Sequence, residues 1–438
     1  MRGRTVTRLG DSCWCGRLTG GLPLYVLSKP GFRQKSALLA VGFGSMDQRV
    51  PATAGEPALP LPPGAAHFLE HRMFLKRQGD ITERFAELGV EADANTTYTH
   101  TGYQCSGTDH LDEALDLLLE LVFEPYLTVP GVAREREIIV REIELYGDNL
   151  EWVSYFQAVD ALYPGHPLAT DIAGTIESVK RLDRAVLARC HRAFYHPGNM
   201  ALFVCGDVAA EAVASVVEAG LRRRGIGPDG SGGGKTRPIR HLVRGGRPAS
   251  RHSVLPVVLP HRSLAFADPR AGLRGTAMLA RELALELALD ILFGAASAFY
   301  CRRYAEGLVD SGSFGFEVNV EPWFSFSLIG GDSRWPDELQ RAVLDELRRA
   351  RQSGVIEAQF ERARGKAYGH LVQGLDQVEA GIQLMHAAVS CGAHPFDLIA
   401  AHERLDAAQV RDALVTGLDP QCHGLVRIDP APTDPTDR

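Results

Sequence analysis

Two stretches of the chain follow the same order of apolar and polar positions. Residues 101–125, TGYQCSGTDHLDEALDLLLELVFEP, predict a strand, a turn with an aspartate, and a helix with leucines at helical spacing. Residues 324–350, FSFSLIGGDSRWPDELQRAVLDELRRA, predict the same elements in the same order. A helix rich in acidic and basic residues follows each stretch, at 130–149 and 357–377, and a further long helix follows each of those. This order predicts an internal duplication, visible as a pattern and not as identity.

The stretch between the two copies has a different composition. Residues 225–249, GIGPDGSGGGKTRPIRHLVRGGRPA, show no apolar periodicity and are rich in glycine, proline and basic residues. This composition predicts a solvated linker. The predicted domains are therefore 1–224 and 250–438. Each domain mixes short alternating strands with helices of about 12 to 20 residues, which is typical of α+β layers.

Composition narrows the class of protein. A chain of 438 residues is expected to form two or more domains. Its composition, with 45% hydrophobic and 23% charged residues, is typical of a soluble globular protein. The net charge of −7, without a strongly basic block, argues against a nucleic-acid partner. No uninterrupted apolar stretch approaches the ~18 residues of a membrane span, and the N-terminal residues have no apolar core of signal-peptide length.

Eight scattered cysteines indicate a reducing setting, so we expect the protein in the cytoplasm. Only Cys13 and Cys15 are close together, and their spacing matches neither a zinc knuckle nor a redox pair.

The short motif HFLEH, residues 67–71, carries the candidate chemistry. On a helix, His67 and His71 lie four residues apart on one face, and Glu70 lies beside that face. Zinc in a catalytic site takes three protein ligands and leaves a fourth position to water, whose proton a nearby carboxylate can accept. The motif supplies two ligands and that base, in the inverted order of the H-E-x-x-H zinc peptidases. The alternative is a helix whose histidines are satisfied structurally, but the apolar flanks predict a buried helix, where unpartnered polar groups are expensive.

A third ligand is expected from residues 133–149, AREREIIVREIELYGDN. Glu135 and Glu142 lie seven residues apart, hence on one face of a helix, and Ile138, Ile139 and Leu145 suggest that part of this helix packs inward. Glu142 as ligand with Glu135 as its supporting partner would meet the need for oriented ligands. The alternative is a solvated charge run, which we favour for Glu137 and Glu144.

Together these residues resemble the insulinase/pitrilysin-type (M16) zinc peptidases, over nearly the whole chain. HFLEH resembles the zinc helix of the family, and RERE…VRE the segment that holds the third ligand, here Glu142, and its supporting glutamate, here Glu135. HPLATDIAGTIESVKRL, HRAFYHPGNMALFVCGDV and DILFGAASAFYCRRYAEGLVDSGSFGFE resemble three further hallmark stretches. The short bacterial members that resemble processing proteases are the most similar.

The resemblance implies a fold of two homologous α+β halves, each a mostly antiparallel sheet covered by helices. It implies one zinc per chain, because the second copy of the zinc helix, MLARELALELALDILFG, has no histidine. Two such chains, or one chain of double length, would close like a clamshell around short or unfolded peptides, which would add as a strand beside Asn95. Processing of precursor or leader peptides is a further expectation by analogy.

One position departs from the family pattern. Single-chain members carry an arginine and, seven residues later, a tyrosine that bind substrate and stabilise the transition state; here these positions hold Arg303 and Asp310. An anionic side chain cannot donate to a developing oxyanion. We therefore expect a second, similar chain that supplies this pair in a heterodimer, with a homodimer as the alternative. A non-catalytic scaffold subunit is the alternative function, and an unrelated hydrolase is disfavoured because no G-x-S-x-G-type site is present.

Overall fold

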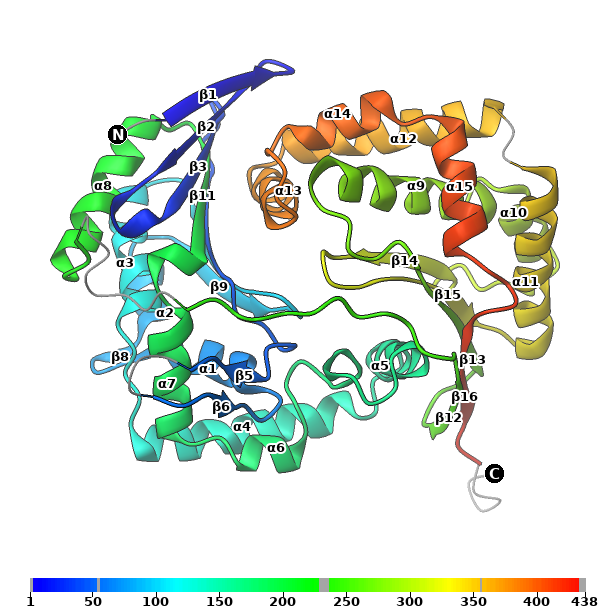
Figure 1. The fold of residues 1–438 in the computed structure, drawn as a ribbon, viewed down its shortest axis with the longest axis horizontal. Coiled ribbons are helices and arrows are strands. Elements are labelled where there is room, and N and C mark those ends of the chain that lie inside the picture. Colours follow the sequence, from blue (N-terminus) through cyan, green and yellow to red (C-terminus); the bar gives the residue numbers. More distant parts are fainter. Residues whose placement is uncertain (1–2, 53–55, 228–235, 355–356, 433–438) are drawn as a thin grey trace. The chain divides into compact units, whose positions relative to one another are not determined.

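The computed structural model describes residues 3–52, 56–227, 236–354 and 357–432. The chain divides into two compact units, each with its own core (Figure 1). The first comprises residues 1–143, 170–240 and 374–387, and the second residues 144–169, 241–373 and 388–438.

The first unit is built on a seven-stranded sheet in the order β1-β2-β3-β11-β4-β10-β9 (Figure 1). Its strands are β1 (Gly3–Arg8), β2 (Asp11–Arg17), β3 (Pro23–Ser28), β4 (Lys35–Val41), β9 (Glu91–Thr96), β10 (Thr101–Gly107) and β11 (Met200–Gly206). Only the β3–β11 pair is parallel. Two short ribbons accompany this sheet: β5 (Arg49–Val50) with β6 (Leu59–Pro60), and β7 (Leu75–Lys76) with β8 (Gly79–Asp80).

Helices of the first unit pack their apolar faces on this sheet and on one another. They are α1 (Ala65–Phe74), α2 (Ile81–Glu87), α3 (Leu111–Phe123), α4 (Val129–Tyr146), α6 (Ile176–Lys180), α7 (Arg184–Phe194) and α8 (Ala210–Arg223). Short 3-10 turns lie at Thr19–Gly21 and Pro197–Asn199. Polar side chains cap the N-termini of several helices. At the start of α7, for example, the Asp183 carboxylate accepts a hydrogen bond from the Val186 amide.

The second unit repeats this plan in a smaller sheet, in the order β12-β16-β13-β15-β14. Its strands are β12 (Ser250–Leu255), β13 (His261–Ala267), β14 (Gly315–Val320), β15 (Ser325–Asp332) and β16 (Gly424–Pro430). Its helices are α5 (Leu150–Leu162), α9 (Gly275–Phe293), α10 (Ala298–Ala305), α11 (Pro336–Ser353), α12 (Glu357–Leu375), α14 (Asp397–Arg404) and α15 (Ala407–Gly417), with a 3-10 turn at Pro167–Ala169.

The strand directions confirm the predicted duplication. In β3-β11-β4-β10-β9 and in β12-β16-β13-β15-β14, the first pair is parallel and the following three pairs are antiparallel. Helix α9 follows β13 as α1 follows β4, so α9 is the counterpart of the helix that carries HFLEH. The α+β fold of two homologous halves with mostly antiparallel sheets is therefore confirmed.

The units are not the continuous domains 1–224 and 250–438 that the sequence predicted. Helix α5 packs on β16, β13 and β12 of the second unit, whereas most of α13 (Val378–Ser390) belongs to the first. The composition of residues 225–249 predicts a solvated segment. Composition does not show on which sheet a given helix packs. Residues 228–235 of the predicted 225–249 linker lie outside the described residues.

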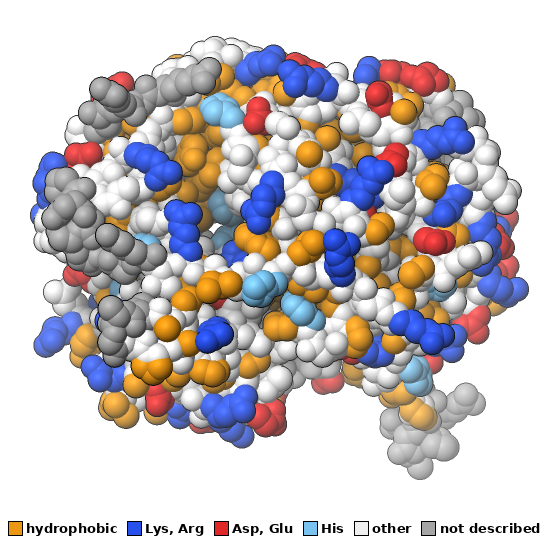
Figure 2. All heavy atoms as spheres, viewed as in Figure 1, with side chains coloured by type: hydrophobic (Ala, Val, Ile, Leu, Met, Phe, Trp, Pro, Cys, Tyr) orange, Lys and Arg blue, Asp and Glu red, His pale blue; other side chains and the backbone are white. Residues whose placement is uncertain are grey.

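Helix α9 and the residues that follow it, up to Ala305, are rich in apolar residues. By length and composition alone the stretch Gly275–Ala305 could cross a membrane, but 67% of its most apolar window is buried. Residues of α9 from Met278 to Phe293 form the centre of the second core, which accounts for the apolar sequence. On the face shown in Figure 2, basic and acidic side chains are interspersed.

Candidate metal centre

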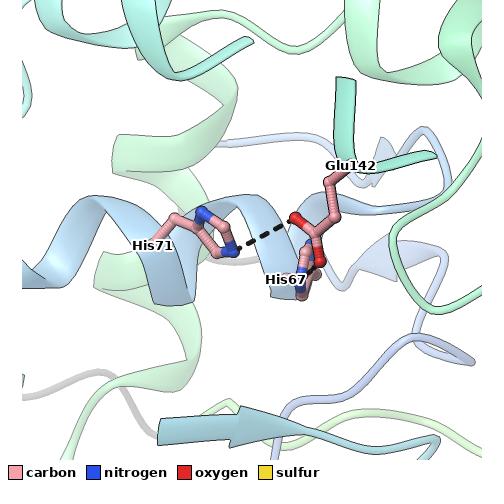
Figure 3. Close-up of side chains that lie close together, drawn as sticks. All are labelled: His67, His71 and Glu142. Atoms are coloured by element: carbon pink, nitrogen blue, oxygen red, sulfur yellow. Dashed lines mark ion pairs between the residues drawn. The ribbon is translucent and has the colours of Figure 1, made fainter. Parts of the chain in front are cut away.

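Three side chains of the first unit converge where α1 meets α4. His67 and His71 project from successive turns of α1, and Glu142 reaches toward them from α4 (Figure 3). Glu142 Oε1 lies 3.6 Å from His67 Nε2, and Glu142 Oε2 lies 3.6 Å from His71 Nε2. One potential ligand atom from each residue lies within 4.8 Å of the other two.

These spacings fit a shared cation better than direct hydrogen bonds. At 3.6 Å the carboxylate oxygens are beyond normal hydrogen-bonding distance from the imidazole nitrogens. Two ligands bound to zinc at about 2.0 to 2.1 Å in tetrahedral geometry lie about 3.4 Å apart. Two imidazoles and one carboxylate are also a known donor set of catalytic zinc sites. The residues present therefore fit a zinc ion.

Local sequence explains the position of α1. Gly64, the residue before the helix, has a φ of 86°, and a Cβ there would lie 2.3 Å from the Ala173 carbonyl oxygen. Glycine at this position lets α1 start in close contact with the neighbouring loop. Phe68, Leu69 and Met73 then bury the opposite face of the helix in the first core.

His67 has the properties of a neutral imidazole ligand. Burial, with a contribution from nearby His71, lowers its pKa to about 3. Its buried Nδ1 atom has no hydrogen-bond partner among the described residues. The neutral ring keeps a lone pair available, as metal binding requires.

His71 is oriented from behind by Glu135. The two side chains form a hydrogen bond of 3.1 Å between His71 Nδ1 and Glu135 Oε1, which leaves Nε2 directed at Glu142. Burial opposes protonation of His71, but this hydrogen bond and the surrounding carboxylates outweigh it and raise the pKa. A carboxylate that fixes the ring and tautomer of a histidine is the usual support of a metal ligand.

Arg72, which the sequence analysis did not single out, holds Glu135 in turn. Arg72 is 1% exposed, and its guanidinium donates to Glu135 Oε2 at 3.3 Å and to the Tyr126 carbonyl at 3.2 Å. An arginine inside the apolar run AAHFLEHRMF was the available signal, because a buried guanidinium requires a partner.

Glu70 lies between the two histidines in sequence and is held by β9. The Thr96 hydroxyl donates to Glu70 Oε2, and Thr96 in turn contacts the Thr101 hydroxyl at 3.3 Å. Burial raises the pKa of Glu70 to about 7, although the Thr96 hydrogen bond lowers it. A carboxylate titrating near neutrality can both accept and return a proton. No sequence pattern pointed to Thr96, because its contact with Glu70 joins a strand to a helix that lies elsewhere in the chain.

Helix α4 is oriented differently from the expected arrangement. Ile138 and Leu145, predicted to face inward, are 47% and 75% exposed. The buried apolar residues of α4 are Val132 and Ile139, so the inward stripe is narrower than predicted and Glu135 and Glu142 lie at its side. Glu137 and Glu144 are exposed, as expected for a solvated charge run.

The remaining candidates lie elsewhere in the two units. Asn95 is exposed on β9, next to Thr96, and strand alternation directs its side chain to the face opposite that of Thr96. In the second unit Arg303 forms an ion pair with Glu306 of 2.7 Å, and the Asp310 carboxylate accepts from the Gly312 amide and the Ser313 hydroxyl. Both side chains thus have local partners, and a substrate role for Arg303 stays a prediction.

Comparison with known proteins gives the same family from two directions. Residues 60–176 match the family model of insulinase (peptidase family M16), and residues 181–366 match that of the peptidase M16 inactive domain. The chain is 31% identical to the uncharacterized zinc protease YmfH of Bacillus subtilis, covering 93% of this chain and 94% of that protein. It is 28% identical to mitochondrial-processing peptidase subunit beta of Caenorhabditis elegans, over 35% of each.

A solved structure supports this assignment. The crystal structure of a putative M16-like peptidase from Alicyclobacillus acidocaldarius superposes with a TM-score of 0.88 at 30% identity, covering 97% of this chain and all of that one. The chain belongs to the M16 family of peptidases.

Proposed function

We propose that this protein is a zinc-dependent endopeptidase that hydrolyses short or unfolded peptides. The observation that carries the proposal is the convergence of His67, His71 and Glu142 at the spacing that zinc ligands require. The zinc-protease names of similar chains, such as YmfH, support the choice of metal.

The residues divide the chemical work among them. His67, His71 and Glu142 would hold one zinc ion, which when bound polarises the scissile carbonyl and activates a water molecule. Glu70 accepts the proton of the attacking water and passes it to the leaving amine. Thr96 holds the Glu70 carboxylate, and Glu135 holds the ring of His71.

Peptide binding is assigned to the edge of the first sheet. β9 is the last strand of that sheet, it pairs with β10 on one side, and its residue Thr96 contacts Glu70. An extended peptide that adds to β9 would run past the base, with Asn95 beside it. Backbone hydrogen bonds would then supply most of the binding, with little demand on the side chains of the substrate. Processing of precursor or leader peptides is one use of such loose specificity.

We propose that the active unit contains a second M16-like chain. The hydroxyl donor of single-chain members is replaced by Asp310, whose carboxylate is engaged in its own turn. One similar chain is a named subunit, that of the mitochondrial-processing peptidase, which supports a partner without identifying it. We further propose a cytoplasmic setting, supported by eight cysteines that are all free thiols. A non-catalytic scaffold is the less favoured function, because a scaffold has no need of the buried Glu70 beside this ligand set.

Zinc removal and restoration test the proposal. The purified chain, assayed with its partner if one is required, should contain one zinc, lose peptide hydrolysis on chelation and regain it with one equivalent of zinc. His71→Ala should lose both zinc and hydrolysis, whereas His370→Ala, a change at an exposed histidine of α12, should keep both. Hydrolysis that survives complete zinc removal would contradict the proposal, as would two bound equivalents.

A further inference from the structure

A second group of possible metal ligands, three sulfur-containing side chains, lies on the first sheet and does not include the candidate zinc ligands. Cys13 and Cys15 lie two residues apart on β2, so their side chains point to the same face of the sheet. Met385 of α13, the helix that joins the first unit from the second half of the chain, packs on that face. The Cys13 sulfur lies 3.8 Å from that of Cys15 and 3.9 Å from that of Met385.

These distances equal those between sulfur ligands of one metal ion. Metal–sulfur bonds of about 2.3 Å place neighbouring sulfurs about 3.8 Å apart in tetrahedral geometry and about 4.0 Å apart in trigonal geometry. Cys13 would therefore need little movement to share a cation with either neighbour.

Burial and access also suit a bound cation. Cys13 is fully buried and Met385 is 2% exposed, while Cys15 is half-buried and offers a route from solvent. Leu27 of β3 is the strand partner of Cys13 on β2 and adds an apolar side chain beside it. A largely buried group of sulfur atoms in apolar surroundings disfavours hard, strongly hydrated cations.

We propose that Cys13, Cys15 and Met385 form a binding site for a soft monovalent cation, Cu(I). Two thiolates and a thioether are the donors that Cu(I) prefers, whereas zinc sites use cysteine, histidine and carboxylates without methionine. Binding exchanges two thiol protons for one cation and involves no change of oxidation state. The proposal gives a role to the C-x-C spacing, which the peptidase site does not explain. It also gives a role to the packing of α13 on β2, which brings Met385 to Cys13.

Titration of the full-length, reduced, zinc-loaded protein with Cu(I) tests the site. Cu(I) is supplied without oxygen as the complex of a coloured chelator, and its transfer to the protein is followed by loss of the chelator colour. We expect one equivalent to transfer without release of zinc, with sulfur-only coordination in X-ray absorption. Ag(I) should compete for the same site.

Variants distinguish this site from incidental thiol binding. Cys15→Ser should lower the affinity for Cu(I) about 100-fold or more, and Met385→Leu, which preserves volume, about 10-fold. The double variant Cys301→Ser/Cys422→Ser removes the two exposed thiols and should bind as the unaltered protein does.

Zinc content and melting temperature report whether each variant is folded, and Met385→Leu keeps the test usable if Cys15→Ser unfolds. No transfer from the chelator would overturn the proposal. Equal affinity of Met385→Leu and the unaltered protein, or displacement of zinc by Cu(I), would also overturn it.

Discussion

Replacement of Glu135 by alanine separates the support of a ligand from the ligand itself. Glu135 does not contact the proposed zinc position; it holds His71 through a 3.1 Å hydrogen bond and Arg72 through one of 3.3 Å. Glu135→Ala therefore leaves all three ligands present but frees the ring of His71 and deprives a buried guanidinium of its carboxylate.

The structure gives a magnitude for each consequence. Loss of a hydrogen-bonding partner behind a metal ligand weakens zinc binding about 10- to 100-fold, or about 1.4 to 2.7 kcal/mol. Glu142→Ala removes a ligand and should exceed that range. Arg72 keeps its hydrogen bond to Tyr126, so the metal-free Glu135→Ala protein should lose about 1 to 3 kcal/mol of unfolding free energy.

Competition with a zinc chelator of known affinity measures the first effect, and denaturant unfolding of the metal-free protein measures the second. Glu137→Ala is the matched control, because Glu137 is exposed on the same helix two residues further on, and it should change neither quantity. If Glu135→Ala weakens zinc binding more than Glu142→Ala does, the third ligand is assigned to the wrong glutamate. If Glu135→Ala behaves as Glu137→Ala does, the support of His71 by Glu135 is wrong.

Two further predictions concern stability and assembly. Burial lowers the pKa of His191 and of His386 to about 4. Because these values lie below the unfolded value of about 6.5, the unfolded chain takes up protons first as the pH falls, and each histidine should cost about 2 kcal/mol of stability between pH 7 and pH 5. Denaturant unfolding should show this loss, and His386→Phe should reduce the pH slope by one proton; an unchanged slope would contradict it. The isolated chain should bind zinc yet cleave peptides poorly until a partner chain that carries an arginine–tyrosine pair is added. Activity assays and mass measurement in solution test this, and full activity of the isolated chain, insensitive to the partner, would exclude the heterodimer.

The grouping of the candidate metal ligands was predictable in part, because the spacing of the two histidines and Glu70 is local to one helix. His67 and His71 share a helix face by spacing alone, and the HFLEH order places Glu70 beside them. Glu142 followed from helical spacing and from the resemblance to a family, and the structure brings its carboxylate to both histidines. The strand order of the two sheets likewise agrees with the duplication visible in the pattern of apolar positions.

What the sequence could not predict depends on contacts between distant segments. The Thr96 hydroxyl meets Glu70 only because β9 lies beside α1, and α13 reaches β2 across more than half of the chain. Ile138 and Leu145 misled the prediction for α4, because apolar residues also occur on exposed helix faces and periodicity alone does not distinguish the two.

The most direct test of the proposed function is peptide hydrolysis by Glu70→Gln, compared with the unaltered protein at equal zinc content and with the same partner. The substitution removes the base and leaves His67, His71 and Glu142 in place, so zinc binding should persist while turnover falls by a factor of about 100 or more. Retention of zinc with loss of hydrolysis is the predicted result. Near-normal turnover by Glu70→Gln would contradict the assignment of Glu70 and, with it, the proposed chemistry of the site.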